Sequence, residues 1–170
     1  MERVPGDEVQ GVVDAWRRER PDLDVSSIGI VTPLVRLAGL LADARSAALA
    51  AHELDQSHLD VLGTLRRAGA PFRLTAGELS RRCRVTPGAT TQRVAALEKL
   101  GFVERVREEP DRRTVHVRLT ARGRQRVDEI LADVLAADDR LLAGLTAQQR
   151  DSLEGSLRTW LRAASSGGHA

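Results

Sequence analysis

A segment with helical patterning ends in a glycine and is followed at once by two alternating strands, an order that few folds accommodate. Thr86 and Pro87 are typical of a helix start, because a threonine side chain caps a helix and proline suits its first turn. The predicted helix runs to Leu100, and Gly101 supplies the left-handed turn that ends it. Apolar and polar residues then alternate over 102–107 and 114–119, which predicts a β-hairpin with residues 108–113 between its strands.

A second, shorter helix is predicted just before this one. Thr75 and Glu78 have the spacing of a capping box, in which each side chain bonds the other residue's backbone N–H, and the helix should run to about Arg82. Two helices joined by a tight turn and followed by a hairpin define a winged helix-turn-helix. The predicted fold class is therefore mainly α with a small β-hairpin wing, flanked by N- and C-terminal helices.

Helical patterning also covers most of the chain on both sides of this region. Pro21 ends a first helix, Thr32-Pro33 is interpreted as the cap of a second, and Asp55 as the cap of a third. One compact domain is expected overall. Within it we predict N-terminal helices over 1–54, the winged helix-turn-helix over 55–120, C-terminal helices over 121–164 and a flexible tail over 165–170.

Positive charge is concentrated in the middle of the chain. Residues 61–126 contain 16 Lys or Arg and 6 Asp or Glu, so this region carries +10 although the whole chain carries +2. Such a footprint is typical of a module that binds a polyanion, and the alternative is an ordinary solvated surface. Aromatic residues make up only 2% of the chain, which disfavours single-stranded nucleic acid as the partner because its bases stack on aromatic rings.

Several other classes of protein are disfavoured. The chain has neither an apolar run of membrane-spanning length nor the apolar segment of a signal peptide, so a cytoplasmic protein is expected. Cys83 is the only cysteine and is interpreted as a small buried residue, with a redox role as the alternative. His52 and His58 do not share a helical face, and no catalytic triad or phosphate-binding loop is found, so we expect no enzyme, metal or cofactor.

The helix predicted from Thr86 has one apolar face and one face of small or hydrogen-bonding residues. Thr90, Val94, Leu97 and Leu100 share the first face and should pack inward. The second face can enter a major groove, where Thr91 and Gln92 would contact base edges, and the arginines of the hairpin would reach phosphates or a minor groove. The alternative is that these are ordinary exposed residues. The predicted DNA-binding residues are Thr86, Gly88, Thr91, Gln92, Lys99, Arg112 and Arg113.

Two motifs in this region resemble the MarR family of bacterial transcriptional regulators. The first is Val-Thr-Pro-Gly-Ala-Thr-Thr-Gln-Arg-Val-Ala-Ala-Leu-Glu-Lys-Leu-Gly-Phe-Val at 85–103, and the second is Asp-Arg-Arg at 111–113 followed by Leu-Thr-x-x-Gly at 119–123. The resemblance extends over nearly the whole chain. It implies a homodimer in which the helices of 1–54 and 121–164 are dimerisation helices that interlock. The two wings of the dimer would grip a pseudo-palindromic site in double-stranded DNA.

The N-terminal helix with Trp16 is similar to that of the MarR subgroup that responds to urate and related purines. This resemblance implies a ligand site formed by Trp16, Asp60, Glu78, Thr91 and Arg93. Asp60 would pair with Arg93 in the free protein, and an anionic aromatic ligand would compete for Arg93 and shift the recognition helix. Each residue has a structural alternative: Trp16 as a filler of the dimer core, Asp60 and Arg93 as a structural ion pair, and Glu78 as the capping residue.

Together these observations predict a DNA-binding repressor that is released from its operator by urate or a related purine. One alternative is a MarR-type regulator that responds to a phenolic compound or to another signal. A second alternative is a helical adaptor that has lost DNA binding, although the basic hairpin argues against it.

Overall fold

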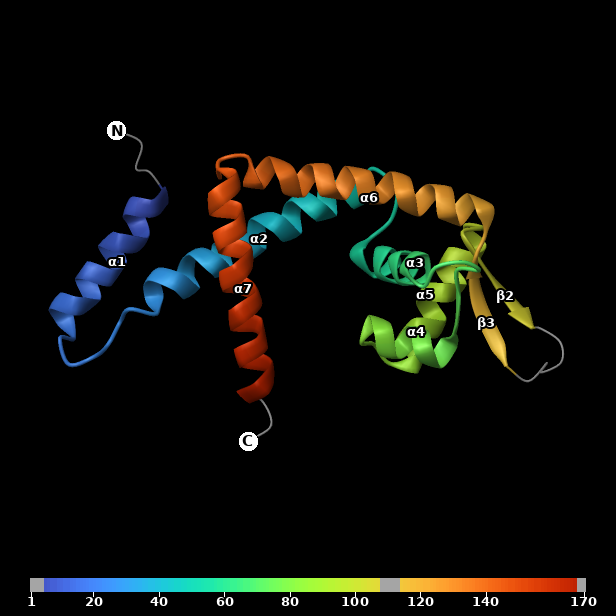
Figure 1. Ribbon diagram of the computed structural model, residues 1–170, viewed down its shortest axis with the longest axis horizontal. Helices are drawn as coiled ribbons and strands as arrows, with labels where there is room; N and C mark the ends of the chain where they lie inside the picture. The colour runs from blue at the N-terminus through green and yellow to red at the C-terminus, as the bar shows by residue number, and fades with distance from the viewer. Residues whose placement is uncertain (1–4, 108–113, 168–170) are drawn as a thin grey trace. The chain divides into compact units, whose positions relative to one another are not determined.

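The computed structural model describes residues 5–107 and 114–167, and these form two compact units. The first unit contains residues 1–47 and the second contains residues 48–170, so the boundary falls inside the second helix (Figure 1). Arg112 and Arg113, predicted to contact DNA from the hairpin, lie outside the described residues.

The N-terminal unit consists of helix α1, Pro5–Glu19, and most of helix α2, Ile28–Ala50. The prediction that Thr32 caps α2 is wrong, because the helix begins four residues earlier. Its first turn forms on carbonyl oxygens of the preceding turn: Ile28 N donates to Val25 O at 3.1 Å, and the next two residues follow the same pattern. Pro33 stays in the helix because its fixed φ is helical, at the cost of one backbone hydrogen bond.

Three short helices follow in the second unit, and local capping explains where they start. Helix α3, Gln56–Arg67, begins after Asp55, whose side chain accepts a hydrogen bond from His58 N. Helix α4, Ala76–Cys83, begins at the predicted capping box, since Thr75 and Glu78 bond each other's backbone N–H. Helix α5, Pro87–Lys99, is capped by Thr86, and Gly101 follows it with a φ of 73°. These predictions are confirmed.

The sheet has three antiparallel strands rather than the two that the sequence predicted. Strands β2, Val103–Arg107, and β3, Val115–Leu119, form the predicted hairpin, with Val103 opposite Leu119. Strand β1, Arg73–Thr75, pairs with the other edge of β3, giving the order β1-β3-β2. Three residues are too few to show a period of two, so sequence patterning missed β1.

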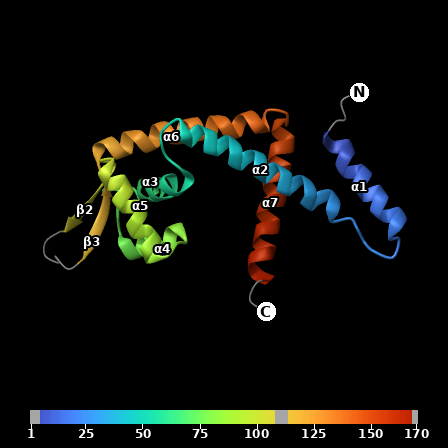
Figure 2. The ribbon, with the colours of Figure 1, turned by 180° about the vertical axis from the view of Figure 1, so that it is seen from behind.

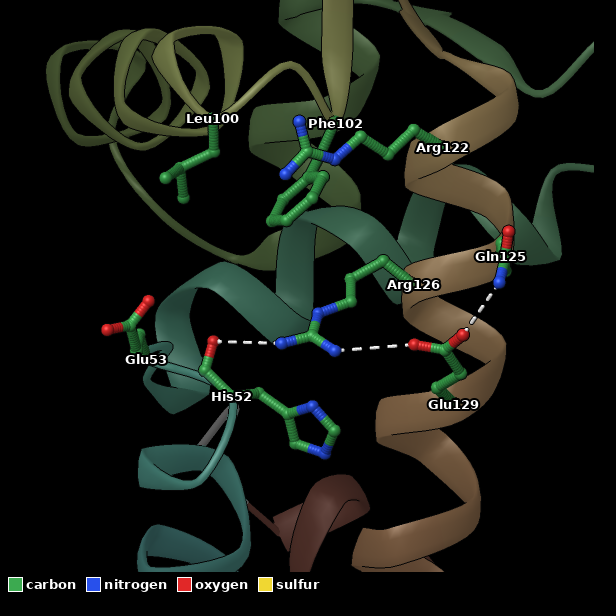
Figure 3. Close-up of a pocket in the computed structure, with 8 residues that line it drawn as sticks. All are labelled: His52, Glu53, Leu100, Phe102, Arg122, Gln125, Arg126 and Glu129. Atoms are coloured by element: carbon green, nitrogen blue, oxygen red, sulfur yellow. Dashed lines mark hydrogen bonds and ion pairs between the residues drawn. The ribbon is translucent and has the colours of Figure 1, made fainter.

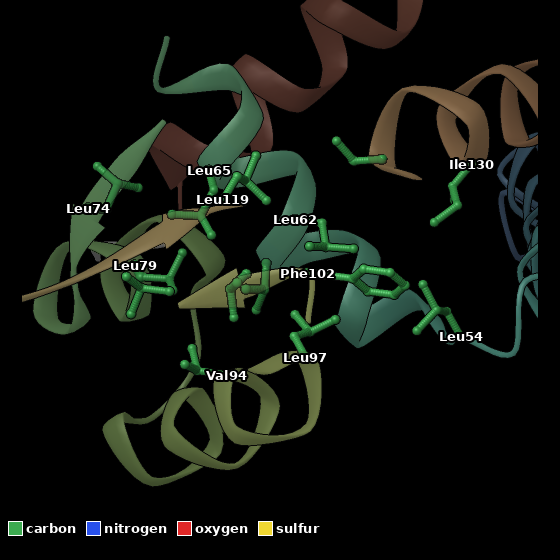
Figure 4. Packing of buried hydrophobic residues seen from close by; sticks show 14 of the residues in the cluster. Leu54, Leu62, Leu65, Leu74, Leu79, Val94, Leu97, Phe102, Leu119 and Ile130 are labelled. Carbon is green, nitrogen blue, oxygen red and sulfur yellow. The ribbon is translucent and has the colours of Figure 1, made fainter. Parts of the chain in front are cut away.

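The core of the second unit lies between α3, α4, α5, the sheet and α6, which spans Ala121–Leu142 (Figure 4). Viewed from behind, α3, α4 and α5 gather beside the two strands of the hairpin (Figure 2). Fully burying one aliphatic side chain stabilises a fold by about 1.5–3 kcal/mol. Residues with little or no exposed surface in this cluster include Val61, Leu62, Leu65, Leu79, Leu97, Val127 and Ile130.

Leu100 does not join this core, although the helical pattern predicted that it would. The residue is 41% exposed because α5 has already ended at Lys99. Thr90, Val94 and Leu97 are buried as predicted. The buried face of α5 therefore extends to Leu97 and does not include Leu100.

Helix α6 approaches the start of β2 very closely through Gly123. A Cβ atom at this position would lie 1.9 Å from the carbonyl oxygen of Phe102, which is far inside contact distance. That oxygen also accepts a backbone hydrogen bond from Thr120 at 3.1 Å. The glycine of the Leu-Thr-x-x-Gly motif is therefore needed for close packing between α6 and the strand.

The last helix, α7, spans Ala147–Gly167. The flexible tail predicted from residue 165 is therefore corrected, since 165–167 continue the helix. Ser165 and Ser166 donate side-chain hydrogen bonds to carbonyl oxygens one turn earlier, at 2.8 and 2.9 Å, so they do not interrupt it. Nowhere in 5–107 or 114–167 is a helix long and apolar enough to cross a membrane.

Candidate nucleic-acid interface and ligand site

The outward face of α5 carries the residues that the sequence predicted for DNA contact. Thr86, Gly88, Thr91, Gln92 and Lys99 are all exposed, on the side of the helix opposite its buried residues. The small residues at 88 and 89 leave the N-terminal end of the helix unobstructed, which close approach to a groove requires. Every described residue in that set is therefore accessible on one side of α5, and its contact with DNA stays a prediction.

Gln92 and Thr91 differ in how free their side chains are. The Gln92 amide makes no hydrogen bond with any residue that the structure describes, so its donors and acceptor are all available. The Thr91 hydroxyl donates to Pro87 O at 3.0 Å, which leaves only its acceptor capacity free. Gln92 is therefore the better suited of the two to read a base edge with paired hydrogen bonds.

A buried pair of hydroxyl groups fixes α5 on α4. Ser80 Oγ lies 2.8 Å from Thr90 Oγ1, so one hydroxyl donates to the other. The hydroxyl that accepts in this pair donates to a carbonyl oxygen one turn earlier, either Thr90 to Thr86 O at 3.1 Å or Ser80 to Ala76 O at 2.9 Å. Buried polar groups that are fully bonded hold one arrangement, so the two helices present a fixed surface.

Three exposed arginines at the end of α4 extend the basic surface, and sequence reasoning counted them only in the charge balance. Arg81, Arg82 and Arg84 precede the cap of α5. An open hollow of about 770 Å³ lies between the helices and is lined in part by Arg81, Arg84 and Thr86. The Arg-Arg-Cys-Arg run at 81–84 was the signal, because it ends the helix that precedes the predicted recognition helix.

Arg93 is the one residue of the predicted ligand set with an unsatisfied buried group. Its side chain is half-buried, and Nη1 is buried without a hydrogen-bond acceptor among the described residues. A buried donor without a partner costs about 1–3 kcal/mol, and more when the group is charged. Such a nitrogen is suited to an anionic acceptor that the free chain does not supply.

The predicted ion pair between Asp60 and Arg93 is not formed. Asp60 Oδ1 accepts a hydrogen bond from Gln56 Nε2 at 2.9 Å, one turn earlier on α3, and no ion pair joins it to Arg93. The pairing of Asp60 and Arg93 in the free chain is therefore corrected. Local geometry explains the difference, since residues four apart on a helix are neighbours.

Glu78 has the capping role that was its structural alternative. Its Oε2 accepts hydrogen bonds from Thr75 N at 2.9 Å and from Thr75 Oγ1 at 2.8 Å. The backbone hydrogen bond from Thr75, followed by the side-chain bond, lowers the pKa of Glu78 below its usual value.

Trp16 belongs to the N-terminal unit, on α1, where 48% of its surface is exposed.

Cys83, His52 and His58 each contact polar groups of neighbouring residues. Cys83 is half-buried, with Sγ 3.6 Å from Asp60 O and 3.5 Å from Thr64 Oγ1. His52 Nε2 lies 2.7 Å from Asp133 Oδ2, and His58 Nδ1 lies 2.9 Å from Asp55 Oδ1. Within the described part of the chain, no three His, Cys, Asp or Glu residues are grouped so as to hold a metal ion.

The fold and the exposed face of α5 define the class of winged helix-turn-helix proteins. The sequence pattern of the MarR family matches residues 52–114. The repressor Rv2887 from Mycobacterium tuberculosis is 36% identical over 117 residues, which cover 69% of this chain and 82% of that protein. This chain belongs to the MarR family.

Three further comparisons cover more of the chain. The regulator PecS from Dickeya dadantii is 29% identical over 150 residues, covering 88% of this chain and 90% of PecS. The crystal structure of Rv2887 with DNA matches 77% of this chain and 96% of that one, with a TM-score of 0.63 and 32% identity. Rv2887 with salicylic acid matches with a TM-score of 0.61 and 33% identity, over 77% and 95%. The matched relatives are named as transcriptional regulators, in agreement with the prediction of a regulator rather than an enzyme.

Proposed function

We propose that this chain is a repressor that binds a pseudo-palindromic site in double-stranded DNA through the exposed face of α5. The observation that carries this proposal is the free Gln92 amide on an unobstructed helix face, with Arg81, Arg82 and Arg84 beside it. The amide reads base edges, and the arginines neutralise phosphates. The related Rv2887 has been solved with DNA, which supports the same partner here.

The repressor acts as a homodimer. Many large apolar side chains on α1, α2 and α7 are exposed, which is unusual for an isolated chain and typical of an interface. A second copy presents the same surfaces and pairs two reading heads on the two halves of a palindrome. A helical adaptor would also use such faces, but it would not need the basic surface next to α5. The exposed residues are Val12, Trp16, Ile30, Val31, Leu34, Val35, Leu37, Leu40, Leu153, Trp160 and Leu161.

A small anionic aromatic ligand, urate or a related purine, releases the repressor. The buried, unpaired Nη1 of Arg93 supports an anion at this point of α5, with Thr91 on the same helix. Asp60, Glu78 and Trp16 complete the proposed set. Because Arg93 is on the recognition helix, an anion bound there shifts the position of α5 and weakens DNA binding. A phenolic ligand is the second candidate, because Rv2887 has been solved with salicylic acid.

The first test of DNA binding is a gel-shift titration on the DNA upstream of the protein's own gene, at fixed salt. Gln92→Ala should weaken specific binding by about tenfold or more, since a bidentate contact contributes about 1–3 kcal/mol. Gln148→Ala, an exposed residue on α7, is the matched control and should bind as wild type. Arg112→Ala tests the hairpin. Equal specific binding by wild type and Gln92→Ala would contradict the proposed role of α5.

The ligand is tested in the same assay with urate and, separately, with salicylate. Urate should release wild type from DNA but leave Arg93→Ala bound. Release by salicylate alone would select the phenolic alternative, and release of both proteins alike would remove Arg93 from the ligand site.

A further inference from the structure

Helix α3 joins the other parts of the winged-helix unit to α6. It contacts α4 and α5 as well as α6, and we use the term reading head for α3, α4, α5 and the sheet together. Val127, Ile130 and Val134 of α6 are buried in the core that the reading head shares with α6. Because apolar burial is non-directional, this packing leaves the angle between the reading head and α6 to the polar contacts around it.

Arg66 attaches the C-terminal end of α3 to α6. Its Nε donates to Asp128 Oδ1 at 2.8 Å and its Nη2 donates to Asp128 Oδ2 at 3.2 Å, so one guanidinium holds both oxygens of one carboxylate. The guanidinium carbon also lies 5.1 Å from the centre of the Phe72 ring. An exposed ion pair contributes little unless its geometry is a bidentate fork of this kind, which fixes the orientation of both groups. We call this pair the first clamp.

His52 attaches the link before α3 to α6, through its ring and through its backbone. Its Nε2 lies 2.7 Å from Asp133 Oδ2, and only 10% of its side chain is exposed. Its carbonyl oxygen accepts a hydrogen bond from Arg126 Nη2 at 3.4 Å, and Arg126 Nη1 in turn lies 3.3 Å from Glu129 Oε2 (Figure 3). We call these contacts the second clamp. The two clamps therefore hold α3 and the link before it to α6 from both ends of the helix.

Helix α6 leads from the clamps to α7, a proposed dimer helix in the same unit. In a dimer, the angle between each reading head and its α6 therefore sets the separation of the two copies of α5. One base pair more or less between two half-sites moves one of them by about 3.4 Å along the DNA and turns it by about 35° around the axis. A reading head that is fixed on α6 thus fits one spacing.

We propose that the two clamps make this protein selective for the spacing between the halves of its operator. They hold the reading head at one angle on α6, so a single spacing places both copies of α5 in the major groove without deforming the DNA. When a clamp is removed, the reading head turns on its apolar packing and accepts neighbouring spacings. The clamp residues are positioning residues and need not contact DNA. This inference rests on the proposed function, a dimer on pseudo-palindromic DNA.

The test compares three DNA duplexes: the operator upstream of the protein's own gene, and two variants with one base pair added or removed between the half-sites. In gel-shift titrations of the full-length protein at fixed salt, wild type should bind both variants at least tenfold more weakly than the operator. Asp128→Asn breaks the fork and should reduce this difference to threefold or less, whereas Asp128→Glu keeps the carboxylate and should retain most of it. Asp133→Ala tests the second clamp independently, even if Asp128→Asn does not fold.

The matched control removes a fork of the same kind elsewhere in the chain. Arg20 donates from Nε and Nη2 to the two carboxylate oxygens of Asp22 at 2.8 and 2.7 Å, in the turn after α1, so Asp22→Asn should keep the selectivity of wild type. If the clamp variants lost affinity for all three duplexes by the same factor, their role would be structural only and the inference would be overturned. Equal binding of wild type to all three would overturn it while DNA binding stands, and no specific binding at all would overturn the proposed function as well.

Discussion

The apolar side chains of the winged-helix unit and those of α1, α2 and α7 have opposite surroundings. Leu62 and Leu97 are buried completely between α3, α5 and the sheet, whereas Ile30 on α2 and Leu161 on α7 are 64% and 67% exposed. Both regions have helices with apolar residues at helical spacing. Helical spacing therefore predicts that a face will be covered, but it does not say whether the same chain covers it.

The winged-helix core is therefore stabilised within one chain, whereas the exposed faces of α1, α2 and α7 would be stabilised by a second copy. The winged-helix core is complete within one chain, so its stability should not depend on protein concentration. The exposed faces gain their burial only on association, so their contribution should depend on concentration.

The most damaging single change to the winged-helix unit should be Gly123→Ala. The added Cβ would lie 1.9 Å from Phe102 O, so α6 must move away from β2 and the core beneath them must open. We expect a loss of about 4 kcal/mol or more in the free energy of unfolding, measured by urea denaturation. Gly11→Ala on α1 is the control, because nothing lies within 4 Å of its added Cβ. Similar stability of the two variants would contradict the close packing described here.

A pair of leucine truncations tests the comparison directly. Leu97→Ala should lower the free energy of unfolding by about 2–5 kcal/mol at every protein concentration, because it leaves a cavity in a core that one chain completes. Leu161→Ala should instead weaken dimerisation, measured by sedimentation equilibrium. It should lower the free energy of unfolding only at protein concentrations at which the dimer dissociates. If both losses were independent of concentration, the exposed face of α7 would not be a dimer surface.

Removing the cap of the recognition helix should have a moderate effect. Thr86 Oγ1 accepts a hydrogen bond from Ala89 N at 3.3 Å, and Thr86→Ala leaves that N–H without its partner. The expected loss is about 1 kcal/mol in thermal or urea denaturation, and Thr86→Ser should restore most of it. A Thr86→Ser variant as unstable as Thr86→Ala would assign the loss to packing of the methyl group instead.

The smallest effect concerns the capping box of α4 and depends on pH. The pKa of Glu78 is lowered in the folded chain by the hydrogen bonds from Thr75, so its contribution to stability is complete above the unfolded value of about 4.3. That contribution is lost as the pH falls through the lower, folded pKa. Urea denaturation between about pH 5 and pH 2 should therefore show a shallower loss for Glu78→Gln than for wild type. Equal slopes would show that the carboxylate contributes nothing.

Local chemistry made much of the fold predictable. The caps at Asp55, Thr75 and Thr86 and the left-handed Gly101 each depend on neighbouring residues, so sequence spacing was enough to predict them. The start of α2 was predicted wrongly because the carbonyl oxygens of residues 25–27 accept hydrogen bonds from the backbone N–H groups of residues 28–30. The helix therefore begins before Thr32. Strand β1 was missed because its partner is more than 40 residues away in the sequence.

The candidate sites were predictable to different degrees. The exposed face of α5 follows from helical geometry, so the DNA-contact residues lie where expected, although their role stays a prediction. The Asp60–Arg93 pair depended on distances between helices, which sequence patterning does not supply, and Asp60 bonds Gln56 instead. The two clamps between α3 and α6 were not predicted, because their residues come from separated segments and only the fold brings them together.

Arg84 combines an unfavourable backbone with a useful side chain. It ends α4 with a φ of 55°, a left-handed conformation that glycine adopts more easily than any other residue by about 1 kcal/mol. A glycine would therefore make the turn between α4 and α5 more stable, but it would remove a cation beside the proposed DNA surface. Under the proposed function, the left-handed Arg84 keeps a positive charge next to α5 at a cost in the backbone stability of this turn.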